Sequence, residues 1–71
     1  MNRKEVKKLV KSWDWNYSIW EVYDEVKHYS RTDKKLILSF ADHYFNDEYS
    51  LKCFRDMASY WNIETEGVDW T

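Results

Sequence analysis

The chain of 71 residues contains no proline and a single glycine, Gly67. The turns between the strands of a β protein depend on these two residue types, because they supply fixed or positive φ angles. Their scarcity favours helices joined by short polar turns and argues against a sheet of many short strands. A chain of this length forms one domain. We therefore expect an all-α fold, a compact small bundle of three to four short helices.

Apolar residues recur at spacings of three and four positions, which predicts four helices. The expected ranges are 2–12, 18–29, 34–45 and 48–62. Each start has a residue whose side chain can cap a helix. These are Asn2 with Glu5, Ser18 with Glu21, Thr32 or Asp33, and Asp47. The Ser-x-x-Glu pattern at Ser18 is the clearest of the four start signals.

The third predicted helix is apolar over about half of its circumference, so we expect it to lie at the centre. The predicted core is Leu9, Val26, Ile37, Phe40, Tyr44, Leu51, Phe54 and Ala58. We expect residues 1–63 to form a single helical domain and residues 64–71 to form an acidic C-terminal tail. A three-helix core with a mobile first helix is the nearest alternative.

The sequence lacks the residue groupings on which catalysis and metal binding depend. Cys53 is the only cysteine and lies at the margin of an apolar helix face, where it acts as a small hydrophobe. His28 and His43 each lie four positions from an aspartate, a spacing typical of ordinary surface pairs. There is no glycine-rich loop to hold a phosphate. We therefore expect no enzyme activity, no metal and no cofactor.

Charge and hydropathy set expectations for location. No stretch approaches the roughly 20 apolar residues that span a bilayer, so we expect no membrane contact. A lone cysteine fits a reducing cytoplasm.

The net charge is −2, but residues 1–11 carry five basic side chains against Glu5, whereas residues 61–71 carry three acidic side chains and no basic one. The two ends could therefore attract each other or face different partners.

Two features allow an alternative as a nucleic-acid-binding regulator. Lys4, Lys8 and Lys11 form a basic stripe that could follow a phosphate backbone, although a solvated helix face is the simpler interpretation. Residues 40–54 can be aligned with a helix-turn-helix, but the segment that would read DNA is poor in basic residues. Nucleic acid is therefore the less favoured partner.

Aromatic residues make up 20% of the chain, and a domain this small cannot easily bury all of them. Trp13 continues the apolar stripe of the first helix, whereas Trp15 and Trp20 fall outside the stripes. Such rings are favoured anchors at interfaces. The candidate partner-binding residues are Asp14, Trp15, Tyr17, Trp20, Asp24 and Glu25, with Asp69 and Trp70 in the tail. The alternatives are rings that pack on one another and a frayed tail.

These observations favour a small acidic, non-catalytic protein-binding module in the cytoplasm, with a partner that has a basic surface. Its most concrete form is a phage or mobile-element inhibitor of a host protein, of the anti-defence or anti-CRISPR type, in the host cell cytoplasm. It would act by steric blocking or by acidic mimicry of nucleic acid. Abundant Lys, Asn and Tyr with scarce Ala, Gly and Pro indicate A/T-rich coding. A homodimer or larger homo-oligomer is a further alternative, because small cores invite self-association.

Overall fold

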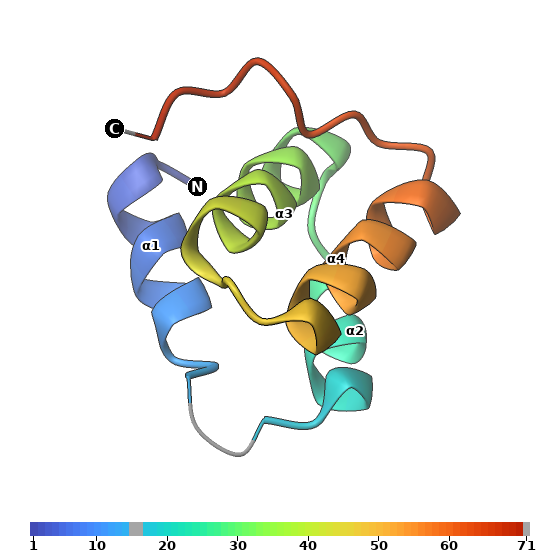
Figure 1. The fold of residues 1–71 in the computed structure, drawn as a ribbon. Coiled ribbons are helices and arrows are strands. Elements are labelled where there is room, and N and C mark those ends of the chain that lie inside the picture. Colours follow the sequence, from blue (N-terminus) through green and yellow to red (C-terminus); the bar gives the residue numbers. More distant parts are fainter. Residues whose placement is uncertain (15–16, 71) are drawn as a thin grey trace.

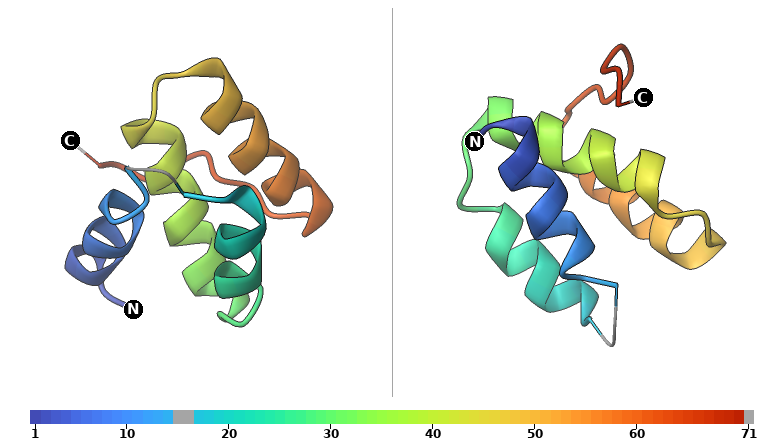
Figure 2. Two further views of the ribbon diagram at one scale, coloured as in Figure 1. Left: turned by 90° about the horizontal axis from the view of Figure 1, so that it is seen from below. Right: turned by 90° about the vertical axis from the view of Figure 1, so that its left-hand side faces the viewer.

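The computed structural model describes residues 1–14 and 17–70. Four α-helices follow one another in this part of the chain: α1 (Arg3–Lys11), α2 (Ile19–Val26), α3 (Arg31–Tyr44) and α4 (Glu48–Tyr60). Helix α3 lies between α1 and α4 in two perpendicular views (Figures 1 and 2). The described residues contain no strand, so the predicted all-α bundle is confirmed.

Helix α1 begins where the sequence predicts and is docked on the bundle. The Asn2 side chain accepts a hydrogen bond from the Glu5 amide at 2.8 Å, and the Glu5 carboxylate accepts one from the Asn2 amide at 3.1 Å. This reciprocal pair is a capping box. Val6 and Val10 lie fully buried on the side of α1 that contacts α3. The first helix is therefore part of the core, unlike the three-helix alternative.

The boundary between α2 and α3 differs from the prediction. Ser18 precedes α2, but its side chain makes no capping hydrogen bond, and α2 ends at Val26 instead of Tyr29. Helix α3 begins at Arg31, three residues earlier than expected. Its cap is neither Thr32 nor Asp33, because the Ser30 hydroxyl accepts the Asp33 amide at 3.2 Å.

Helix α4 starts at the predicted cap, where the Asp47 carboxylate accepts the Ser50 amide at 2.8 Å. It ends in a Schellman motif: the Asn62 amide bonds the Ser59 carbonyl at 3.0 Å, and the Ile63 amide bonds the Ala58 carbonyl at 2.8 Å. Asn62 has a φ of 54°, a left-handed conformation that asparagine tolerates.

The Arg31 guanidinium donates to the Trp61 carbonyl at 2.9 Å and also to the Asn62 carbonyl. A cation at a helix C-terminus satisfies free carbonyls and complements the helix dipole. The same side chain therefore joins the start of α3 to the end of α4.

The core is larger than predicted. Of the eight predicted residues, Val26, Ile37, Phe40, Phe54 and Ala58 are buried, whereas Leu9, Tyr44 and Leu51 are partly exposed. Trp13 is buried as expected and stacks on Phe54 at 5.9 Å. The other buried apolar residues are Val6, Val10, Val22, Leu38, Ala41, Phe45, Met57, Ile63 and Trp70.

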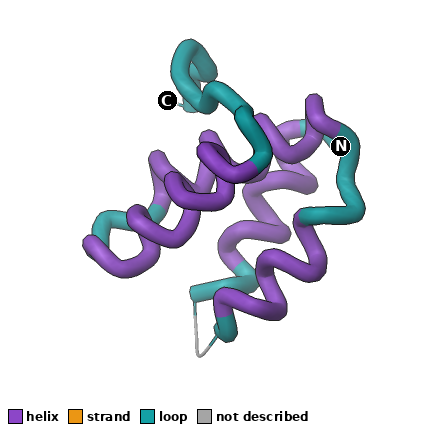
Figure 3. Tube along the Cα trace, turned by 90° about the vertical axis from the view of Figure 1, so that its right-hand side faces the viewer, coloured by secondary structure: helices purple, strands orange, loops and turns teal. Residues whose placement is uncertain are grey.

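Residues 64–70 cross over α3, from the end of α4 towards the start of α1 (Figures 1 and 3). Gly67 has a φ of 86°, which a side chain would make unfavourable, and it turns the segment at this point. The last described residue, Trp70, therefore lies beside α1. The amino group of Met1 also pairs with Asp33 on α3 at 2.9 Å.

The two serine caps give a matched test of this account of the helix starts. Ser30→Ala should lower the free energy of unfolding by about 1 kcal/mol, because it removes the acceptor for an otherwise free helix amide. Ser18→Ala should cost less than half of that, because the Ser18 side chain makes no such bond. Urea unfolding followed by circular dichroism measures both values. A larger cost at Ser18 than at Ser30 would contradict these boundaries.

Candidate partner-binding surface

The α2–α4 groove is an apolar groove of about 430 Å³ between these two helices. It is lined by Ile19, Trp20 and Tyr23 from α2 and by Cys53, Asp56, Met57 and Tyr60 from α4. On α2, Tyr23 follows Ile19 by four residues and Trp20 by three, and the α4 positions follow the spacing i, i+3, i+4 and i+7, so each set shares one face. Helix α2 directs Val22 and Val26 into the core. Trp20 and Tyr23 therefore point sideways, towards α4.

Two aromatic side chains of the groove are unusually exposed. Trp20 keeps 75% of its surface in contact with solvent and Tyr60 keeps 72%. Tyr23 between them is partly buried: it stacks on Trp61 at 5.3 Å and meets Tyr60 edge-on at 6.2 Å. Hydrogen bonding with Tyr60, followed by desolvation, raises the pKa of Tyr23. The groove therefore combines a fixed inner ring with large rings that solvent still reaches.

One carboxylate, that of Asp56, lines the α2–α4 groove, and further acidic residues lie on α2. Helix α2 contains Glu21, Asp24 and Glu25 and no basic residue. Lys27, just after α2, pairs with Asp24 at 3.2 Å, and Lys52 on α4 pairs with Asp56 at 3.1 Å. All four side chains of these pairs are well exposed, so the pairs contribute little to stability.

Arg55 points elsewhere, since it bonds Asp42 on α3 at 2.8 Å. Within the part of the chain that the structure describes, Glu21 and Glu25 form no ion pair. The charges on α2 that are not neutralised by an ion pair are therefore negative.

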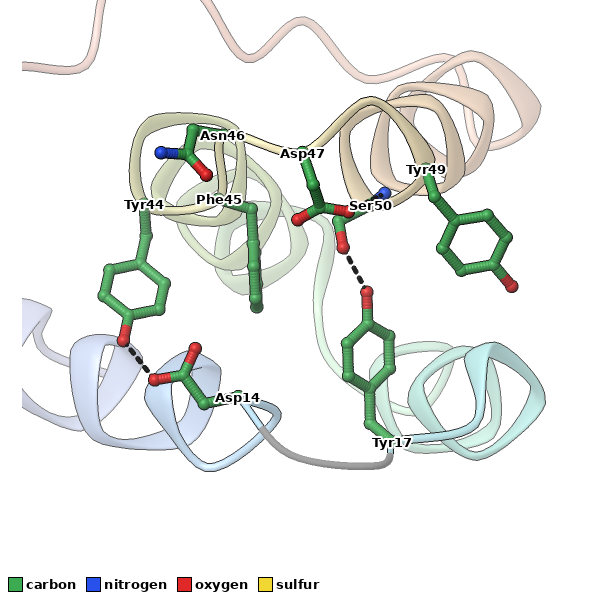
Figure 4. A pocket seen from close by; sticks show the side chains of 8 residues that line it. All are labelled: Asp14, Tyr17, Tyr44, Phe45, Asn46, Asp47, Tyr49 and Ser50. Atoms are coloured by element: carbon green, nitrogen blue, oxygen red, sulfur yellow. Dashed lines mark hydrogen bonds between the residues drawn. The ribbon is translucent and has the colours of Figure 1, made fainter.

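A second pocket, of about 540 Å³, lies where the α1–α2 connection meets the loop between α3 and α4 (Figure 4). It is lined by Asp14, Tyr17, Tyr44, Phe45, Asn46, Asp47, Tyr49 and Ser50. Most of its polar groups already bond one another. Tyr44 donates to the Asp14 carboxylate, which raises the pKa of Tyr44, and the Tyr17 and Ser50 hydroxyls lie 2.5 Å apart.

The Asp47 carboxylate in this pocket also has its partner, because hydrogen bonds from the Ser50 amide and hydroxyl lower the pKa of Asp47. These contacts hold the α1–α2 connection against the α3–α4 loop. The pocket therefore serves the fold more clearly than it serves a ligand.

Trp70, predicted as a binding residue of the tail, is only 8% exposed. Its indole nitrogen donates to the buried Ser39 hydroxyl at 3.0 Å, and its ring meets Phe40 edge-on at 5.0 Å. The Arg3 guanidinium lies over the indole ring at 4.9 Å and donates to the Asp69 carbonyl. The two ends of the chain are thus in contact, and the Trp70 ring is covered by the protein itself.

The structure distributes the predicted binding residues over separate places. Trp15 lies outside the described residues. Asp14 and Tyr17 line the pocket of Figure 4, whereas Asp69 and Trp70 lie beside α1, where Arg3 contacts both of them. Of the predicted binding residues, only Trp20 lines the α2–α4 groove. Asp24 lies one helical turn further along α2, and Glu25 is exposed on the same helix.

Sequence reasoning missed the α4 wall of the groove, above all Tyr60. A signal was present, because Cys53, Asp56, Met57 and Tyr60 follow helical spacing along one side of α4. It could not be interpreted without knowing which helix lies opposite. Tyr23 packs against the core and also lines the groove.

Other functional features are sparse in the described ranges. No three His, Cys, Asp or Glu side chains gather there to hold a metal ion, and none of the four helices has the length and apolar character to cross a membrane. Lys11 of the basic stripe and the neighbouring Lys7 are partly engaged, because their ammonium groups lie about 6 Å from the Tyr44 and Trp70 rings. No protein-family model, curated protein or solved structure matches the chain.

The docking of Trp70 can be measured directly. Trp70→Ala should lower the free energy of unfolding by about 3–5 kcal/mol, because it removes a buried ring and leaves a cavity. Trp70→Phe should cost less, about 1–3 kcal/mol, because it keeps most of the packing and loses the bond to Ser39. Urea unfolding gives both values. If Trp70→Ala is as stable as the wild type, the tail does not dock and Trp70 returns as a candidate anchor for a partner.

Proposed function

We propose that this protein is a non-catalytic binding module that holds a partner protein in the α2–α4 groove. The observation that supports this most strongly is Trp20, a tryptophan that keeps 75% of its surface exposed beside Tyr60. Exposed apolar surface of this size is unfavourable in water unless a second molecule covers it. Tryptophan and tyrosine also dominate the energetics of known interfaces, because they bring large contact area with few rotatable bonds.

The construction of the groove favours binding with little rearrangement. Tyr23 is held by its stack on Trp61, and the end of α4 is tied to α3 through Arg31. A rigid surface loses little conformational entropy on association, so more of the contact energy appears as affinity. The groove volume of about 430 Å³ suits one or two side chains of a partner.

A narrower form of the proposal is that the partner is a host protein and that the chain is an inhibitor from a phage or mobile element, of the anti-defence or anti-CRISPR type. The composition typical of A/T-rich coding supports this form. Inhibition would follow from steric blocking of the surface that the groove covers. The carboxylates of Glu21, Asp24 and Glu25 would add acidic mimicry if that surface normally binds nucleic acid.

Trp20→Ala tests the location of the site. We expect the helical signal and the melting temperature to stay close to wild type, because the side chain is mostly in solvent. Partner binding should weaken by about 2 kcal/mol or more, as for a hot-spot tryptophan. Affinity purification from the native host, followed by titration of the captured protein, measures the change. Asp24→Lys should also weaken binding to a basic partner, by a smaller amount.

Tyr49→Ala is the matched control, because Tyr49 is an aromatic residue with 64% exposure that lies outside the α2–α4 groove. It should leave binding unchanged. If Trp20→Ala unfolds the domain, Trp20 belongs to the core and the proposed site is wrong. If Trp20→Ala binds the captured protein as well as the wild type, the interface lies elsewhere.

A further inference from the structure

We propose that the α2–α4 groove receives an arginine side chain from the partner. The inference rests on the proposed function and adds the chemistry that the groove recognises. In this arrangement the methylene stem lies on the apolar floor, and the guanidinium lies against the Trp20 ring and the Asp56 carboxylate.

Tyr23 in the groove, and Trp61 stacked on it, each already have a cation of the protein itself near the ring. The Lys27 ammonium lies over the Tyr23 ring at 5.9 Å, and the Lys34 ammonium lies over the Trp61 ring at 4.7 Å. Trp20, the largest ring of the groove, makes no ring or cation contact in the described part of the chain. Tryptophan is the strongest cation-binding ring, so Trp20 is the open position in this pattern.

The charges around the groove select the same kind of side chain. Asp56 lines the groove and Asp24 follows Trp20 by one helical turn, while α2 offers no basic residue. Their lysine partners, Lys52 and Lys27, are exposed and contribute little, so a partner's cation can replace them. An acidic side chain would be repelled, and an aliphatic one would leave the carboxylates without new partners.

The floor explains why arginine fits better than a compact cation. Met57 is only 6% exposed and Ile19 is partly buried, so the base of the groove is apolar. An arginine stem covers such a surface while its head group stays near the rim. The planar guanidinium also stacks on an indole and binds a carboxylate through two parallel hydrogen bonds, whereas an ammonium does neither.

Selection of short random peptides displayed against the wild-type protein provides the test. We expect the enriched peptides to share an arginine next to apolar residues. Replacing that arginine by citrulline, which has nearly the same shape but no charge, should weaken binding about tenfold or more. Trp20→Ala and Asp56→Asn in the protein should each weaken binding, and the Tyr49→Ala control should not. Raising the salt concentration should also reduce affinity.

The possible failures point to different conclusions. Peptides that depend on Trp20 but bind equally well with citrulline would overturn the arginine site and leave the proposed function standing. Equal binding by lysine and arginine peptides would overturn the preference for a guanidinium. Arginine peptides whose binding ignores Trp20→Ala would overturn both the inference and the assignment of the groove. A selection that yields no peptide whose binding depends on Trp20 would overturn the inference. The proposed function would then still be tested separately, by the binding of Trp20→Ala to the partner captured from the native host.

Discussion

Helix α3 has to be covered on most of its circumference, and the rest of the structure follows from this requirement. Ile37, Leu38, Phe40 and Ala41 are successive or nearly successive, so they point in different directions, yet all are buried. Helices α1 and α4 cover two sides of α3. Further cover comes from the C-terminal segment, which brings Trp70 onto Phe40, and α2 adds Val22 and Val26 to the same core. A chain of 71 residues can bury only a small apolar core, so even its last described residue, Trp70, contributes to that core.

A buried serine shows how specific this cover is. The Ser39 hydroxyl donates to the Leu36 carbonyl at 3.1 Å and accepts the Trp70 indole at 3.0 Å, so its hydrogen-bonding capacity is satisfied away from water.

The same coverage explains the position of the groove. The short helix α2 buries Val22 and Val26 and packs Ile19 and Tyr23 against the core, and it leaves Trp20 exposed to solvent. In the α2–α4 groove, core side chains such as Met57 form the floor, and the fold leaves the Trp20 and Tyr60 rings exposed beside it.

The sequence predicts the elements that local rules determine. Asn2 with Glu5 and Asp47 with the Ser50 amide are contacts within four residues, and both predicted caps are present. The α3 start was missed because Ser30, Thr32 and Asp33 are all plausible caps. The contact of Arg31 with the end of α4, some thirty residues away, accompanies the choice of Ser30. The groove could not be predicted for the same reason. Trp20 stands out in the sequence, but whether Tyr60 lies beside it depends on which helices are neighbours in the fold.

The central claim is that a partner covers the α2–α4 groove while α3 and its cover stay unchanged. Amide hydrogen exchange of the protein, alone and bound to its captured partner, tests this claim most directly. The account predicts new protection in α2 and in the half of α4 that carries Cys53 to Tyr60, with α1 and residues 64–70 unaffected. Protection confined to α1 and the tail, with exchange in α2 and α4 unchanged, would contradict it.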